Sequence, residues 1–115
     1  MTEQFTFGGE IVWRPTPLQV EGANLTAFMQ AWGIKDFDAL MQRSTTDVAW
    51  FTEAVLKFLD IKFYEPYSSV VELKDGIQFP KWCVDGRMNI VYNCVEKWAE
   101  DKGQREKIAI AFECE

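Results

Sequence analysis

The sequence predicts a mainly α-helical fold with a few short β-strands, an α+β chain. Apolar residues recur at helical spacing in most of the chain up to residue 60 and again from residue 89. The part between them, residues 61–88, has short apolar runs separated by turn residues. The length of 115 residues suits one domain, and 48% hydrophobic with 15% aromatic content allows a core.

Residues 1–16 are predicted to be an extended N-terminal arm that ends where the first helix begins. Thr16 is the expected N-cap and Pro17 the first helical residue. A second short helix fits residues 24–32, and Gly33 suits the position just after its end.

Two further helices are expected before residue 61. Asp36 is predicted to cap a short helix, and Ser44 with Asp47 matches a capping box in which Ser44 is the N-cap and Asp47 the third helical residue. The helix that this box would open has an apolar stripe and should stop near Asp60. The stripe consists of Val48, Phe51, Val55, Phe58 and Leu59.

Short strands are expected between the helical parts, at residues 61–64, 70–73 and 79–84, the last running into a tight turn at Asp85 and Gly86. A helix should follow with Asn89 as N-cap and Gly103 at its end. One face of this helix is apolar and the other polar. The apolar face holds Ile90, Val91, Cys94, Val95 and Trp98, and the polar face holds Asn93, Glu96, Lys97 and Glu100. Residues 107–113 alternate like a strand, which must pair upstream or with residues outside this sequence.

Charge and composition exclude several classes of function. The net charge of -6 without a basic cluster argues against nucleic-acid binding. There is no histidine, and Cys83, Cys94 and Cys114 lack metal-ligand spacing, so neither a zinc site nor a histidine-dependent triad is expected. The thiols are expected to act as small core residues in a reducing compartment. With no signal peptide and no apolar run of 18 residues, we expect a cytoplasmic chain that does not enter a membrane.

Catalytic and nucleotide-binding motifs are absent from the sequence: it has no Walker A motif, dinucleotide fingerprint, zinc-protease motif or nucleophile elbow. Lys81, Asp85 and Arg87 surround one turn and could contact an anion, although turn chemistry with surface charge is the simpler interpretation. We therefore predict no catalytic, cofactor-binding or metal-binding residue in this chain.

One block carries a family resemblance. Residues 80–95 resemble the signature that precedes the main domain of acetyl-CoA synthetases and of their acetoacetyl- and propionyl-CoA relatives. The matching positions are Trp82, Asp85, Gly86, Asn89, Asn93 and Cys94. Cys83 stands where this family usually has an aromatic residue, and Met88 stands where it usually has leucine. Weaker matches in the same order extend the resemblance over about residues 11–113.

The resemblance implies a structural role beside a catalytic domain. Residues 17–106 would be the helical N-terminal domain, and residues 107–115 the first strand of a truncated adenylating domain. The parent enzyme would use ATP, magnesium and coenzyme A to convert a short acid into its acyl-CoA through an acyl-adenylate, yielding AMP and pyrophosphate. The adenylating domain of the same chain would be the partner, and the isolated segment could self-associate through exposed apolar surface.

Two alternatives remain open at this stage. The chain could instead be a stand-alone interaction module with the same fold, whose aromatic residues contact another protein. The abundance of tryptophan could also reflect nothing more than a small tryptophan-rich core. Acetate, propionate and acetoacetate cannot be separated as substrates, because the acyl pocket of this family lies outside the segment.

Overall fold

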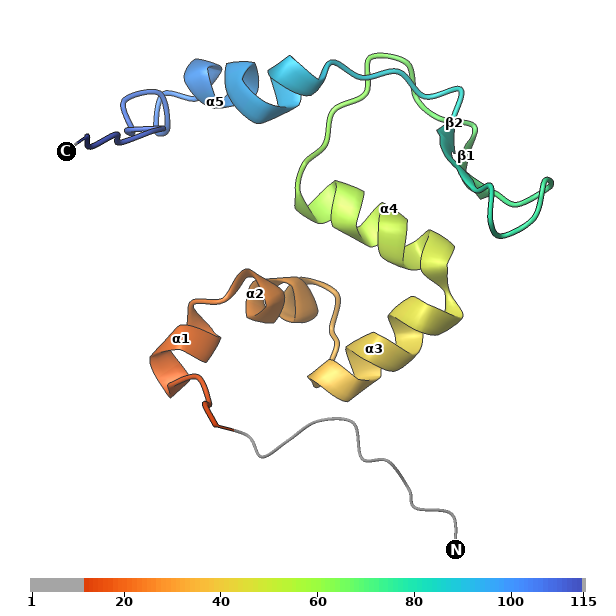
Figure 1. The fold of residues 1–115 in the computed structure, drawn as a ribbon, viewed down its shortest axis with the longest axis horizontal. Coiled ribbons are helices and arrows are strands. Elements are labelled where there is room, and N and C mark those ends of the chain that lie inside the picture. The colour runs from red at the N-terminus through yellow and green to blue at the C-terminus, as the bar shows by residue number, and fades with distance from the viewer. Residues whose placement is uncertain (1–11, 115) are drawn as a thin grey trace, which may run out of the picture. The chain divides into compact units, whose positions relative to one another are not determined.

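The computed structural model describes residues 12–114 and divides the chain into two units, Met1–Gln42 and Arg43–Glu115 (Figure 1). The elements in chain order are α1 (Pro17–Glu21), α2 (Asn24–Ala31), α3 (Phe37–Thr46), α4 (Val48–Phe58), β1 (Ser69–Glu72), β2 (Lys81–Val84), the π-helical turn η1 (Tyr92–Glu96) and α5 (Lys97–Glu100). The described part is mainly helical with one small sheet, as the sequence predicts.

Helix α1 begins as predicted, with Thr16 as N-cap and Pro17 in the first turn. The Gln19 N–H donates to Thr16 Oγ1 at 3.4 Å, and the Thr16 N–H donates to Gln19 Oε1 at 2.8 Å. This capping box satisfies two donors that a helix start would otherwise leave unpaired. An extended arm was predicted for residues 1–16. Residues 1–11 of it lie outside the described range, and residues 12–16 belong to no helix or strand.

Helix α2 ends at Ala31, one residue before the predicted end, and buries Phe28. Gly33 follows at φ 63°, in the left-handed region that suits glycine after a helix, as predicted. The next cap is also confirmed, because the Ala39 N–H donates to Asp36 Oδ1 at 2.8 Å at the start of α3.

The predicted capping box at Ser44 and Asp47 is wrong. Ser44 lies inside α3, which continues to Thr46, and Asp47 is itself the N-cap of α4. The Trp50 N–H donates to Asp47 Oδ1 at 2.9 Å. Aspartate is as good an N-cap as serine, and its negative charge is favoured at a helix N-terminus, so the helix begins at the later residue.

Helix α4 carries the predicted stripe only in part. Phe51, Val55 and Phe58 are half-buried, whereas Val48 and Leu59 are exposed. The most buried residue of the helix is Ala54, with an exposed fraction of 1%, and α4 contacts β1. The helix ends near Asp60 as predicted, where the backbone turns to φ 52°.

The sheet has two antiparallel strands, β1 and β2, with Ser69 opposite Val84 and Val71 opposite Trp82. Val70 is its buried residue. The strand predicted at residues 61–64 does not form; the only pairing near it is a single bridge between Glu65 and Arg87. Pro66 follows this bridge directly and cannot donate a backbone hydrogen bond to a continuing ladder.

Residues 90–100 form one helical stretch that includes η1 and α5. Asn89 caps it as predicted, because its Oδ1 accepts from the Val91 N–H at 2.8 Å and from the Tyr92 N–H at 3.2 Å. The helix ends at Glu100, with Asp101 as C-cap, rather than at Gly103. The Asp101 backbone is extended at ψ 114°, which stops the helical hydrogen bonds two residues earlier than the glycine would.

The burial of this helix agrees with the predicted faces only in part, since Glu96 and Glu100 are exposed as expected of the polar face. Asn93, which we placed on the polar face, is buried, and the predicted apolar residues Ile90, Val91 and Val95 are exposed. Helical spacing identifies which side chains share a face, but burial depends on what covers that face. The segment around Lys62 covers Asn93, whereas residues 104–109 flank only part of the apolar face and leave its outer residues exposed.

Residues 107–114 belong to no helix or strand, so the strand predicted at 107–113 is not formed in the described chain. A strand needs backbone partners on a neighbouring strand, and none of the described residues supplies them here. Ile108, Ile110 and Phe112 are exposed as a result. The assignment of this segment to an adenylating domain stays a prediction.

Candidate functional site

The six signature residues lie in one continuous stretch from β2 to η1 but differ in environment. Their places are Trp82 in β2, Asp85 and Gly86 in the turn after it, Asn89 at the helix start, and Asn93 and Cys94 in η1. The structure brings Asn89 and Asn93 into contact, since Asn93 Nδ2 donates to the Asn89 carbonyl at 3.0 Å. Trp82 and Cys94 are exposed. These six residues therefore do not converge on one site, and most of their contacts organise the local structure.

The turn after β2 depends on Gly86. Its N–H donates to the Cys83 carbonyl at 2.9 Å, and Asp85 beside it has φ 63°. A Cβ atom on Gly86 would lie 2.9 Å from the Cys83 carbonyl oxygen and from Tyr67 Cβ, and 3.1 Å from Phe63 Cε1. The missing side chain thus lets the turn pack directly on the aromatic pair below it.

Two other groups secure the same turn. Phe63 and Tyr67 meet edge to face at 5.2 Å between ring centroids, the favoured geometry for aromatic pairs. Ser68 Oγ donates to Asp85 Oδ2 at 2.7 Å, and the Ser68 N–H donates to the Val84 carbonyl at 2.9 Å. The Asp85 carboxylate therefore stabilises the turn through Ser68.

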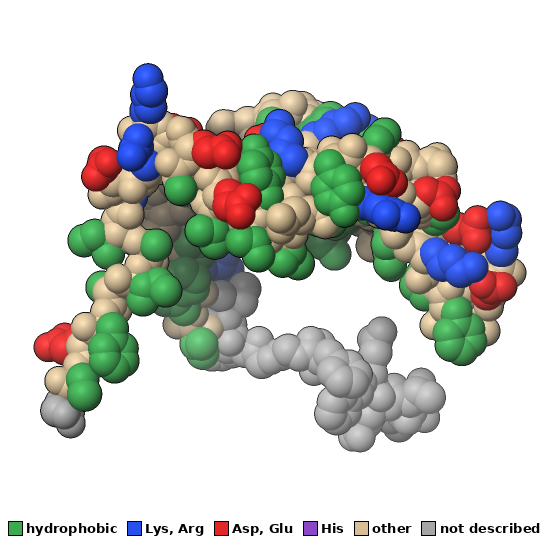
Figure 2. All heavy atoms as spheres, turned by 90° about the horizontal axis from the view of Figure 1, so that it is seen from above, with side chains coloured by type: hydrophobic (Ala, Val, Ile, Leu, Met, Phe, Trp, Pro, Cys, Tyr) green, Lys and Arg blue, Asp and Glu red, His purple; other side chains and the backbone are tan. Residues whose placement is uncertain are grey.

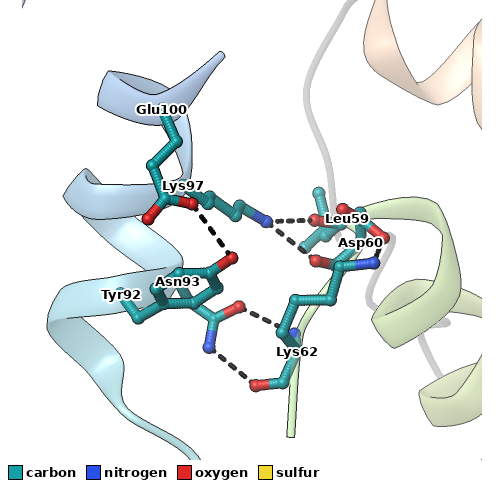
Figure 3. Close-up of polar contacts among 7 residues, drawn as sticks. All are labelled: Leu59, Asp60, Lys62, Tyr92, Asn93, Lys97 and Glu100. Atoms are coloured by element: carbon teal, nitrogen blue, oxygen red, sulfur yellow. Dashed lines mark hydrogen bonds and ion pairs between the residues drawn. The ribbon is translucent and has the colours of Figure 1, made fainter.

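Asn93 connects the helical stretch to the chain that follows α4 (Figure 3). Its Oδ1 accepts from the Lys62 N–H at 2.7 Å, and its Nδ2 donates to the Lys62 carbonyl at 2.9 Å. The asparagine amide thus pairs with an irregular segment as a neighbouring strand would. With an exposed fraction of 6%, Asn93 is the buried polar residue of the described chain.

Lys97 makes a second connection between the same two segments, also visible in Figure 3. Its ammonium donates to the Asp60 carbonyl at 2.8 Å and to the Leu59 carbonyl at 3.2 Å, which satisfies carbonyl groups at the end of α4. Beside it, the hydrogen bond from Lys62 lowers the pKa of Asp60. The contacts of Lys62 and Lys97 were not predicted, because hydrogen bonds between residues 31 and 37 positions apart leave no local pattern in the sequence.

The possible anion site at Lys81, Asp85 and Arg87 is not assembled. Lys81 pairs with Asp75 at 3.0 Å, and the hydrogen bond between them is the main reason why the pKa of the lysine is raised. Arg87 pairs with Glu65 at 3.3 Å. Each cation already has an acidic partner, and this favours the interpretation as turn chemistry with surface charge.

The cysteines differ in environment. Cys83 is half-buried, and burial raises the pKa of its thiol. Cys94 and Cys114 are exposed, so the expectation that the thiols are core residues is wrong for these two. Residues 12–114 contain no cluster of three or more cysteine, aspartate or glutamate side chains arranged to hold a metal ion. Within the same range, no helix is both long and apolar enough to cross a bilayer.

The outer face of residues 90–98 is apolar, whereas the solvent-facing side of a surface helix is usually polar. Ile90 is 70% exposed, Val95 59% and Val91 53%, with Trp98 and Cys94 beside them. A shallow groove of about 190 Å³ runs along this face between Cys94, Val95 and Trp98 on one side and Ala109 on the other. Figure 2 shows many hydrophobic side chains on the surface of the described chain. We call the set Ile90, Val91, Cys94, Val95 and Trp98 the apolar face.

Comparison with known proteins gives a consistent result. Residues 37–94 match the family model described as the acetyl-coenzyme A synthetase N-terminus. An acetyl-coenzyme A synthetase of Ralstonia pickettii is 31% identical over 102 residues, which is 89% of this chain and 14% of that protein. One of Mycolicibacterium smegmatis is 30% identical over 93 residues, 81% of this chain and 8% of that protein. The chain thus spans a small fraction of the length of these relatives. No solved structure matches it.

Proposed function

Because this chain belongs to the acetyl-coenzyme A synthetase N-terminus family, we propose that it is the N-terminal structural segment of an AMP-forming acyl-CoA ligase. The parent enzyme would join a short carboxylic acid to coenzyme A through an acyl-adenylate, with ATP yielding AMP and pyrophosphate. The segment would support the adenylating domain and carry none of the reacting groups.

The apolar face is the observation that carries this proposal. An isolated domain normally turns such residues inward, because each square ångström of apolar surface removed from water contributes about 25 cal/mol. Here the helical stretch uses a polar side chain, Asn93, to attach to its own unit and leaves Ile90, Val91 and Val95 outside. An exposed contiguous apolar surface of this kind is typical of an interaction site. The adenylating domain is the occupant that the family membership supports.

ATP, magnesium and coenzyme A belong to the parent enzyme in this proposal. The described residues do not fit a metal site, and the cations at the turn after β2 are already paired with acids. The contribution of this chain would be to position and cover the domain that holds them.

The coding sequence after Glu115 provides the first test. A continuing reading frame that encodes a glycine-rich loop ending in Pro-Lys-Gly supports the ligase. A stop codon at that point contradicts it and supports the alternative of a stand-alone interaction module.

Enzyme assays provide the second test. We expect the 115-residue chain alone to catalyse no ATP–pyrophosphate exchange with acetate, and the chain joined to its adenylating domain to catalyse it with a short acid. Exchange by the chain alone would refute the structural role. Absence of exchange by the joined protein with acetate, propionate and acetoacetate would refute the ligase assignment.

The docking surface can be tested separately by co-purification with the adenylating domain. Val95→Glu places a charge in the centre of the apolar face and should abolish co-purification. Gln78→Glu adds the same charge to an exposed loop residue and should leave it intact. Equal co-purification of both variants would contradict the docking role of this face.

A further inference from the structure

An aromatic cavity of about 460 Å³ adjoins Lys62, the residue whose backbone pairs with Asn93. Its lining residues are Lys62, Phe63, Tyr64, Asn89, Tyr92 and Glu96. They come from the irregular segment after α4 and from the helical stretch that Asn93 ties to it. Figure 3 shows Tyr92 next to the Asn93–Lys62 contact. Two lining residues of the cavity, Lys62 and Tyr92, thus lie at this contact.

Most polar groups around the cavity already have partners. The Lys62 ammonium pairs with Asp60, and the Asn89 Oδ1 accepts two backbone hydrogen bonds as a helix cap. The Tyr92 hydroxyl donates to Glu100 at 3.4 Å. Glu96 is different, because its exposed carboxylate forms no ion pair with any described residue.

The charge and shape of the lining select a cation with an apolar stem. Aromatic rings attract cations over their faces, and Tyr64 is largely exposed to solvent. An anion would meet the unpaired Glu96 and would have to compete with Asp60 for Lys62. Long basic side chains place their methylene stem on apolar surface and keep the charged group near water, as this half-open cavity requires.

We propose that this cavity binds an arginine side chain presented by a partner polypeptide. The guanidinium is planar, stacks on aromatic rings and pairs with a carboxylate through two donors. A lysine ammonium is a compact charge that lacks this planar, two-donor geometry. The chain already contains one such stack, with the Arg43 guanidinium 3.6 Å from the centroid of the Trp50 ring. The inference concerns residues of this chain alone and stands apart from the ligase proposal.

A titration followed by NMR tests the proposal with the 115-residue chain. N-acetyl-arginine amide is the probe, and the ring signals of Tyr64 and Tyr92 are the readout. We expect saturable shifts with a dissociation constant on the order of tens of millimolar, since one exposed ion pair and one stacked ring together contribute about 2 kcal/mol. The amides of N-acetyl-glutamine and N-acetyl-glutamate serve as neutral and acidic probes of similar size and should produce no saturable shift.

Two variants and one control complete the design. Glu96→Gln should weaken arginine binding roughly two- to fivefold, the range of an exposed ion pair. Tyr64→Leu should weaken it as well while keeping an apolar residue. Glu106→Gln removes an exposed acid outside the cavity and should leave binding unchanged. Binding of the neutral or acidic probe as tight as that of arginine, or an unaltered affinity in Glu96→Gln, would overturn the proposal.

Discussion

The side-chain amide of Asn93 pairs with both backbone groups of Lys62, accepting from its N–H at 2.7 Å and donating to its carbonyl at 2.9 Å. The two residues are 31 positions apart in the chain. This contact replaces a strand pairing that residues 61–64 do not make, and it decides which side of the following helical stretch faces inward. The exposed apolar face and the aromatic cavity both follow from it.

Replacing Asn93 should therefore destabilise the second unit. Asn93→Ala leaves two partly buried backbone groups of Lys62 without partners, which should cost about 2 kcal/mol of unfolding free energy. Urea unfolding followed by tryptophan fluorescence measures the loss. Cys94→Ala changes the exposed neighbouring residue and should have little effect. Equal stability of the two variants would show that the amide pairing contributes nothing.

Gly86→Ala tests the close packing of the turn after β2. The added Cβ would lie 2.9 Å from both a backbone oxygen and Tyr67 Cβ, so the turn must move away from the aromatic pair. We expect a destabilisation of about 1–3 kcal/mol, as for other overpacked sites. At Gly22, where the nearest atom would lie at 3.4 Å and φ is −80°, alanine should change the unfolding free energy by less than about 1 kcal/mol. Similar unfolding midpoints for both variants would contradict the packing described here.

The stability of α3 should depend on pH through Asp36. Its hydrogen bond from the Ala39 N–H is the main reason why the pKa of this carboxyl lies below the ordinary value of 3.8. Because the folded pKa is the lower one, the stabilisation is fully present above the unfolded pKa and is lost as the pH falls through the folded pKa. Asp36→Asn keeps an oxygen acceptor but removes the titration.

The measurement for Asp36 is urea unfolding at a series of pH values from 6 down to 2.5. The loss of stability on acidification should be smaller in Asp36→Asn than in the wild type. Asp38, two residues after Asp36 in the first turn of α3, accepts no cap hydrogen bond in the described chain, so Asp38→Asn should retain the wild-type slope. Identical slopes in all three proteins would exclude a role for this cap.

Thiol reactivity should separate Cys83 from Cys94. Burial raises the pKa of the half-buried Cys83 thiol, so less of it is thiolate at pH 8, and the reagent also reaches it less easily. We expect the Cys83 thiol to react with Ellman's reagent more slowly than the exposed Cys94, as measured in Cys94→Ser and Cys83→Ser variants that both also carry Cys114→Ser. In urea the two rates should converge. A faster Cys83 under native conditions would contradict its burial.

Local chemistry explains what could be predicted from the sequence. Thr16, Asp36 and Asn89 cap their helices because a short polar side chain can reach a backbone N–H two or three residues ahead. Gly33 adopts its predicted left-handed conformation for an equally local reason. The prediction of Ser44 as the N-cap of α4 was wrong because Asp47, three residues later, is an equally good cap. Ser44 instead lies inside α3, which continues to Thr46.

By itself the sequence determined the mainly helical fold, most of the helix starts and the family, which the block at residues 80–95 carries. Only the tertiary structure decided that Asn93 faces inward, that Lys62 and Lys97 join two segments, and that the apolar residues from Ile90 to Trp98 remain outside. The physical reason is that the spacing of apolar residues shows which side chains share one face of a helix. Whether that face is buried depends on which other segment packs against it. The polar pairing with Lys62 covers one face of this helix, and most of the other face stays exposed in the described chain.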